Sequence, residues 1–119
     1  MNILIMLGNY DKLFLRSIMS ILISVLKDEL DRNHRAQRAY QKELDLYPKG
    51  SLVIKKRKSM DYFYLAYRDA SNRIKTDYIG NVHNPKVKQL QQQIQKRQEI
   101  IEILKVLKHD EHLIRRILK

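Results

Sequence analysis

The sequence predicts a helix-dominated α+β fold, in which two long antiparallel helices are joined by a three-stranded antiparallel β-meander. Apolar residues recur at helical spacing in the first and last parts of the chain, and a tyrosine-rich segment between them alternates with a period of two. Proline and glycine separate these segments. The length of 119 residues fits a single domain over 1–119.

The first helix is expected over residues 11–46. Asp11 is a suitable N-cap, and apolar residues follow at intervals of three and four as far as Leu30. The later part, 31–43, keeps helix-forming residues but has a thin apolar stripe, so we expect it to be more solvated. Pro48 ends the helix, because proline lacks an amide proton and disfavours helix in the residue before it.

The β-meander is expected over residues 51–79. Its first strand begins at 51–54, its second is the tyrosine-rich segment 62–67, and its third is 74–79, where apolar and charged residues alternate. A four-residue turn at 69–72 joins the last two strands. The simplest topology is therefore a meander.

The second helix is expected over residues 85–118. Asn84 is a suitable N-cap, and Pro85 suits the first helical position. The apolar stripe that follows is heptad-like, is broken at Arg97 and drifts in phase toward the C-terminus. This pattern is typical of a helix that packs against an antiparallel partner, either the first helix or a second copy of the chain.

Charge is the main functional signal. The chain has 24 Lys and Arg against 13 Asp and Glu, a net charge of +11. Residues 49–83 carry +5 (8 − 3) and residues 84–119 carry +5 (9 − 4), whereas residues 1–48 carry only +1 (7 − 6). A positive potential of this size attracts polyanions, of which nucleic acid, DNA or RNA, is the commonest.

The sequence lacks a catalytic constellation. It has no cysteine, which excludes disulfides, thiolate zinc sites and a cysteine nucleophile and fits a reducing cytoplasm. It also lacks a Gly-rich phosphate loop and the Ser-His-Asp spacing. We interpret the His-Asp-Glu-His segment at 109–112 as a solvated helix end and not as a metal site. We therefore expect no enzymatic activity, no metal and no cofactor.

The first 26 residues are the most apolar part of the chain. Asp11, Lys12 and Arg16 interrupt them, so no run approaches the ~20 uncharged residues that span a bilayer. The start also lacks the basic residues of a secretory signal. We expect a core or oligomer-interface helix and no membrane partner. Met19 offers an alternative start, which would make residues 1–18 a loosely attached extension.

Cations and aromatic residues concentrate in the predicted meander. A run of four cations lies between the first two strands, where it could straddle phosphates. The period of two places Tyr62 and Tyr64 on one face and Phe63 and Leu65 on the other. Aromatic rings can stack bases while cations hold the backbone, although tyrosine also fills half-buried sheets. The predicted nucleic-acid-binding residues are Lys55, Lys56, Arg57, Lys58, Tyr62, Tyr64, Arg68, Arg73 and Lys75.

Residues 19–118 resemble an uncharacterised family of small bacterial proteins, some of them carried on mobile elements. The resemblance rests on the Leu-Tyr-Pro-Lys-Gly-Ser segment at 46–51, the strand at 62–68, the Tyr-Ile-Gly motif at 78–80 and the long helix after Pro85. The strands are also similar in pattern to the three-stranded N-terminal DNA-binding part of tyrosine recombinases. No recombinase catalytic domain follows, and a likeness of pattern does not by itself carry function.

We therefore predict a non-enzymatic nucleic-acid-binding module that contacts DNA or RNA mainly through its backbone. The alternative is a protein–protein interaction module acting through its helices, for example a regulator or anti-defence inhibitor of a phage or mobile element. The heptad-like stripe and the apolar start favour this alternative, and they also predict a homodimer.

Overall fold

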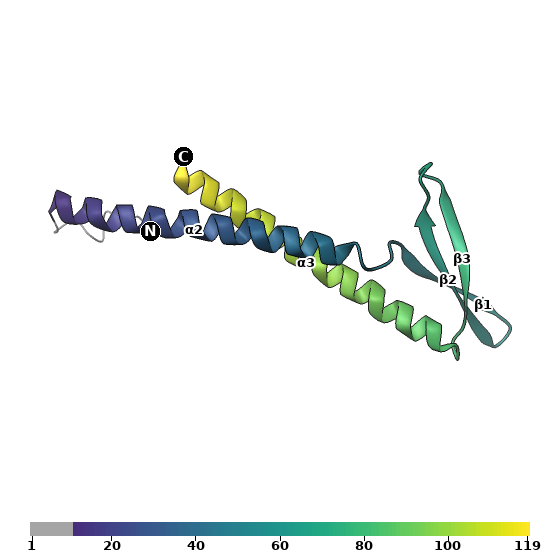
Figure 1. Cartoon of the computed structure of the whole chain (residues 1–119). Coiled ribbons are helices and arrows are strands. Elements are labelled where there is room, and N and C mark those ends of the chain that lie inside the picture. Colours follow the sequence, from purple (N-terminus) through teal and green to yellow (C-terminus); the bar gives the residue numbers. More distant parts are fainter. Residues whose placement is uncertain (1–10) are drawn as a thin grey trace. The chain divides into compact units, whose positions relative to one another are not determined.

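The computed structural model describes residues 11–119 and contains two long helices and a three-stranded antiparallel sheet (Figure 1). The predicted fold class is therefore confirmed. Part of the apolar start, residues 1–10, lies outside the described residues. In the part of the chain that is described, no helix is long and apolar enough to cross a membrane. The elements are α2 (Lys12–Leu44), β1 (Ser51–Arg57), β2 (Met60–Arg68), β3 (Ile74–Asn81) and α3 (Pro85–Leu118).

The chain is divided into two compact units. The described part of the first, the helical unit, consists of residues 11–38 and 106–119. The second, the sheet unit, consists of residues 39–105 and contains all three strands. Both helices contribute residues to both units.

Local signals define the two ends of α2. The predicted N-cap is confirmed, because Asp11 Oδ1 accepts a hydrogen bond of 2.7 Å from the Phe14 amide. The helix ends at Leu44, two residues before the predicted position. The Leu44 carbonyl instead accepts a hydrogen bond of 3.2 Å from the Tyr47 amide, which forms a turn ahead of Pro48.

The N-terminus of α3 is capped as the sequence predicts. Asn84 Oδ1 accepts a hydrogen bond of 2.9 Å from the Lys86 amide. Pro85 occupies the first helical position, where its missing amide proton costs nothing.

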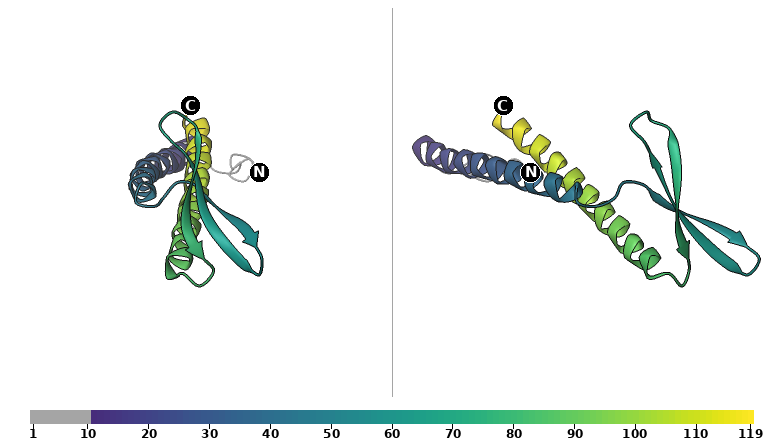
Figure 2. Two further views of the ribbon diagram at one scale, coloured as in Figure 1. Left: turned by 90° about the vertical axis from the view of Figure 1, so that its right-hand side faces the viewer. Right: turned by 45° about the vertical axis from the view of Figure 1, so that its right-hand side comes forward.

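The β1–β2 turn is shorter than predicted (Figure 2). Arg57 pairs with Met60, so only Lys58 and Ser59 connect the strands. Lys58 adopts the left-handed conformation, with φ of 56°. The prediction of a four-cation loop is therefore wrong, because the ladder continues through the three cations that precede Lys58 and makes them part of β1.

Asp69 organises the turn between β2 and β3. Its Oδ1 accepts hydrogen bonds from the Ser71 amide at 2.9 Å and the Arg73 amide at 3.0 Å. Asn72 adopts a φ of 62°, which asparagine tolerates better than most residues. The predicted four-residue turn at 69–72 is confirmed, because the Asn72 amide donates a hydrogen bond of 2.9 Å to the Asp69 carbonyl, and β3 begins at Ile74 as expected.

The sheet unit has a small apolar core between the end of α2 and the middle of α3. Leu44, Ile100 and Leu104 form its centre, with Tyr40 and Ile101 packed against them. Ile100 is only 1% exposed, which makes it the most completely buried large side chain among the described residues.

The helical unit buries polar groups between its helices. Asn33 is 4% exposed, and its Nδ2 donates a hydrogen bond of 2.8 Å to the Leu107 carbonyl. Its Oδ1 accepts a hydrogen bond of 2.6 Å from Gln37 Nε2. The expectation that 31–43 would be the more solvated part of α2 is therefore wrong, because α3 covers it, whereas Ile21 and Val25 in the earlier part are 60% and 57% exposed.

Candidate nucleic-acid interface

The strand register determines which side chains share a face of the sheet. Residues paired in antiparallel strands project from the same face. Tyr62 pairs with Lys55 and Tyr64 with Val53, so these side chains share one face. Phe63 projects from the opposite face and is 6% exposed, whereas both tyrosines are half-buried. Tyr62 and Tyr64 are therefore more accessible than Phe63, and they lie on the other face from it, as the period of two predicts.

Strand β3 adds a third tyrosine to this face. Tyr78 pairs with Tyr64 in the register that continues unshifted from the β2–β3 turn, and a β-bulge follows at Ile79. The Tyr78 ring centre lies 5.4 Å from that of Tyr64, edge to face, and 6.3 Å from that of Tyr62. Tyr78 stays 57% exposed, so it presents a ring to solvent that its neighbours hold in place.

Tyr78 is not among the binding residues predicted from the sequence. Alternation counted from Ile74 places Tyr78 on the same face as Ile74, and the antiparallel register across the β2–β3 turn brings it opposite Tyr64. The available signal was therefore the period of two in β3, read together with the length of the turn at residues 69–73.

Two cations flank the tyrosines. Lys55 Nζ lies 4.8 Å from the centre of the Tyr64 ring, a cation–π contact. Arg57 lines an open hollow of about 360 Å³ together with Tyr62, Tyr64 and Tyr78. We name the set Lys55, Arg57, Tyr62, Tyr64 and Tyr78 the tyrosine face.

Two predicted lysines project from the opposite face. Lys56 pairs with Asp61, and Lys75 pairs with Tyr67. Lys75 Nζ also lies 3.5 Å from the carboxylate of Asp69, an ion pair that partly neutralises it. Both lysines are therefore separated from the tyrosine face by the thickness of the sheet.

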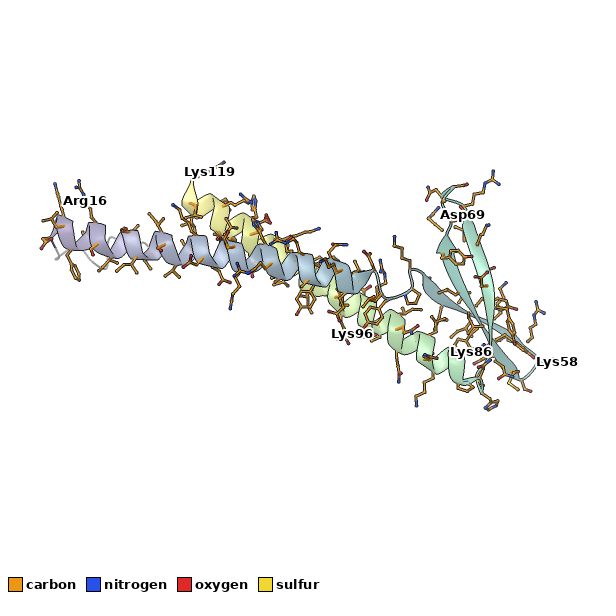
Figure 3. The ribbon with its side chains drawn as sticks, viewed as in Figure 1. Arg16, Lys58, Asp69, Lys86, Lys96 and Lys119 are labelled. Atoms are coloured by element: carbon orange, nitrogen blue, oxygen red, sulfur yellow. The ribbon has the colours of Figure 1, made fainter. Side chains whose placement is uncertain are left out.

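The remaining predicted cations lie toward the ends of the sheet. Lys58 is in the β1–β2 turn, and Figure 3 shows it at the end opposite to Asp69. Arg68 pairs with Ile74, and its guanidinium donates a hydrogen bond of 3.0 Å to the Asn72 carbonyl. By its register, Arg68 projects on the same side as the tyrosine face. Arg73 lies in the β2–β3 turn.

Acidic side chains in the strands lie only on the side opposite the tyrosine face. Asp61 shares that side with Lys56, and Asp77 pairs with Leu65. The hydrogen bond between the Tyr67 hydroxyl and Asp77, and then the charge of this carboxylate, raise the pKa of Tyr67 above its ordinary value of 10.0. The carboxylate of Asp77 is thus engaged on that side.

The His-Asp-Glu-His segment of α3 does not assemble as a cluster. His109 and His112 are exposed, whereas Glu111 turns toward α2. Its carboxylate contacts Gln37 Nε2 at 3.0 Å and His34 Nε2 at 3.1 Å, and these hydrogen bonds lower the pKa of Glu111 below 4.5. Across residues 11–119, no group of three or more His, Asp or Glu side chains is placed to hold a metal ion.

Comparisons with protein-family models, with curated proteins and with solved structures each found no match. Function is therefore inferred from the geometry and charge of the sheet.

Proposed function

We propose that this protein is a non-enzymatic module that binds nucleic acid through the tyrosine face. The proposal rests on the unequal distribution of charge between the two sides of the sheet. The strand side that bears the tyrosine face has Lys55, Arg57 and Arg68 and no acid, a charge of +3. On the other side, two lysines oppose two aspartates, a charge of 2 − 2 = 0. A polyanion is therefore attracted more strongly to the side of the tyrosine face.

The tyrosine face combines the two contacts that a nucleic-acid strand needs. Lys55 and Arg57 supply positive charge for phosphates, which contributes affinity without sequence preference. Tyr78 supplies an exposed ring, and stacking of a base on an aromatic ring contributes about 1–3 kcal/mol. The edge-to-face contact with Tyr64 orients this ring before binding, which lowers the entropic cost of ordering it.

A salt-dependent binding assay with two matched variants tests the proposal. Fluorescence anisotropy is measured for single- and double-stranded DNA and RNA at several salt concentrations. The double variant Lys55→Ala, Arg57→Ala should bind at least about tenfold more weakly, and the slope of log K against log salt for duplex DNA should fall by roughly 0.9 for each phosphate that the variant no longer neutralises.

The control is the double variant Lys56→Ala, Lys75→Ala, which removes the same charge from the opposite side of the sheet. It should keep the wild-type salt slope. Equal weakening by both pairs would mean that net charge attracts nucleic acid without a defined face, and a wild-type protein that binds none of the four ligands would refute the proposal.

A second candidate function is a protein–protein interaction module, for example a regulator or inhibitor from a phage or mobile element, which acts through its helices. The apolar side chains that the first half of α2 exposes favour it. It predicts no affinity for any of the four nucleic-acid ligands, so the same assay separates the two functions.

A further inference from the structure

The first half of α2 presents a wide apolar surface. Within it, Ile21 and Val25 are 60% and 57% exposed, and Leu22 is 36% exposed. At about 100° per residue, the apolar residues of this half fall mainly on one side of the helix. We name that side the apolar stripe, and its residues are Leu15, Ile18, Met19, Ile21, Leu22, Val25 and Leu26.

The apolar stripe continues the side of α2 that contacts α3 within the helical unit. Leu15, Leu22 and Leu26 precede the buried Asn33 by 18, 11 and 7 residues, each close to a whole number of helical turns. Leu30 lines a hollow together with Leu118, the last residue of α3. Figure 3 shows α2 extending past Lys119 toward Arg16. No described residue of α3 is therefore available to cover the stripe.

We propose that the apolar stripe is a homodimer interface, covered by the same stripe of a second copy of this chain. Further along α2, the same side of this helix already packs against α3. Beyond the end of α3, the α2 helix of the second copy packs against this side instead. Residues 12–29 span about 27 Å of helix, which is about five turns over which two copies can interlock their apolar side chains.

Charge favours a second copy over an anionic membrane surface. Residues 11–29 have three basic and three acidic side chains, 3 − 3 = 0, in a chain of net charge +11. Helices that lie on anionic membranes carry an excess of basic residues on their polar face. In this segment the basic residues do not outnumber the acidic ones. Two copies of a +11 chain repel each other, and a neutral segment is where they can approach at the lowest electrostatic cost.

Sedimentation velocity and light scattering of the full chain across the micromolar range test the proposal. The wild type should have twice the monomer mass of 14.3 kDa. The variant Leu22→Lys should raise the dimer dissociation constant at least about tenfold, because a lysine cannot be buried unpaired between two apolar stripes. Far-UV circular dichroism of each variant shows whether the helices are retained.

Leu13→Lys is the matched control. Leu13 is 77% exposed and lies nine residues before Leu22, two and a half turns away, on the opposite side of α2. This variant should remain dimeric. Equal dissociation of both variants, or a monomeric wild type at every concentration, would overturn the proposal and assign the stripe to residues 1–10 or to another protein.

A cross-linking experiment gives an independent measurement, because the chain has no cysteine. Under mild oxidation, Leu22→Cys should form a disulfide-linked dimer and Leu13→Cys should not. Cross-linking of both positions alike, or of Leu13→Cys alone, would exclude this interface even if the mass were dimeric. These outcomes do not depend on whether the tyrosine face binds nucleic acid.

Discussion

Arg97 Nη1 donates a hydrogen bond of 2.7 Å to the backbone carbonyl of Leu44, the last residue of α2. The same nitrogen lies 3.4 Å from the Tyr47 carbonyl. Carbonyl groups in the last turn of a helix have no partner within the helix, and a cation at this end also interacts favourably with the helix dipole. The residue that breaks the apolar stripe of α3 is therefore the one that caps α2.

The variant Arg97→Met tests this capping role. Methionine keeps an apolar stem but removes every donor, so the free energy of unfolding should fall by about 1.5–3 kcal/mol, as for a hydrogen bond from a charged group. Chemical denaturation followed by circular dichroism measures the decrease. The exposed neighbour Lys96 provides the control, and Lys96→Met should change stability by no more than about 0.5 kcal/mol. Equal decreases for the two variants would contradict the role of Arg97.

Most of the fold follows from short-range signals. Asp11 and Asn84 cap the helices as predicted, because capping depends on residues within a single turn. Which part of α2 is exposed does not follow from such short-range signals. Asn33 is buried and Ile21 is exposed because α3 ends beside Leu30, and the periodicity of either helix alone does not state where the other one stops.

The candidate site follows from the sequence only in part. Alternation correctly separates Tyr64 from Phe63, because the period of a strand is fixed. Lys55 and Lys56 are neighbours in the cation run, and they separate onto opposite faces because β1 extends through both of them. Tyr78 joins the site through its pairing with Tyr64, which depends on the register that the β2–β3 turn sets between the two strands.

The pH dependence of stability should reveal the contact between the helices at Glu111. Hydrogen bonds from Gln37 and His34 hold its pKa below the ordinary value of 4.5. A carboxyl group with a lowered pKa in the folded state stabilises the protein above pH 4.5 and loses this contribution as the pH falls through the folded-state pKa. The wild type should therefore be more stable than Glu111→Gln near neutral pH, and the difference should shrink under acid conditions.

Denaturation midpoints for both proteins across the acid range measure this difference. Glu99→Gln serves as the control for the removal of one negative charge, since Glu99 is an exposed residue of the same helix. A difference between wild type and Glu111→Gln that stays constant with pH would show that the carboxylate charge is not what stabilises this contact.

Gly80 should not tolerate a side chain. It is buried, its φ is 158°, and a Cβ atom built on it would lie 2.7 Å from the Cβ of Asn84, the N-cap of α3. Gly80→Ala must therefore displace either β3 or the cap, and we expect the free energy of unfolding to fall by about 1–3 kcal/mol. Thermal unfolding measures it, with Thr76→Ala, at an exposed position of the same strand, as the control. A stability equal to that of Thr76→Ala would show that the close approach is not limiting.

Substitutions of single aromatic residues in the sheet should separate the effect on nucleic-acid binding from the effect on stability. Tyr78 is 57% exposed, so Tyr78→Ala should lower nucleic-acid affinity by roughly five- to 150-fold, the equivalent of about 1–3 kcal/mol for one stacked base. Its effect on stability should be small and should come mainly from the edge-to-face contact with Tyr64, about 0.5–1.5 kcal/mol. Phe63→Ala should do the reverse, since this ring is 6% exposed and truncating a buried phenylalanine costs about 3–5 kcal/mol.

Tyr67→Ala completes the comparison, because Tyr67 is a tyrosine of the same sheet that projects from the opposite side and bonds to Asp77. It removes an identical ring and should leave affinity unchanged. Anisotropy titrations and melting curves for all three variants share one buffer, so that the fraction folded is known at the temperature of the binding assay. If Tyr67→Ala weakens binding as much as Tyr78→Ala, base stacking is not confined to the tyrosine face. If Tyr78→Ala binds as tightly as the wild type, the three tyrosines serve to pack the sheet and nucleic acid is held by Lys55 and Arg57 alone.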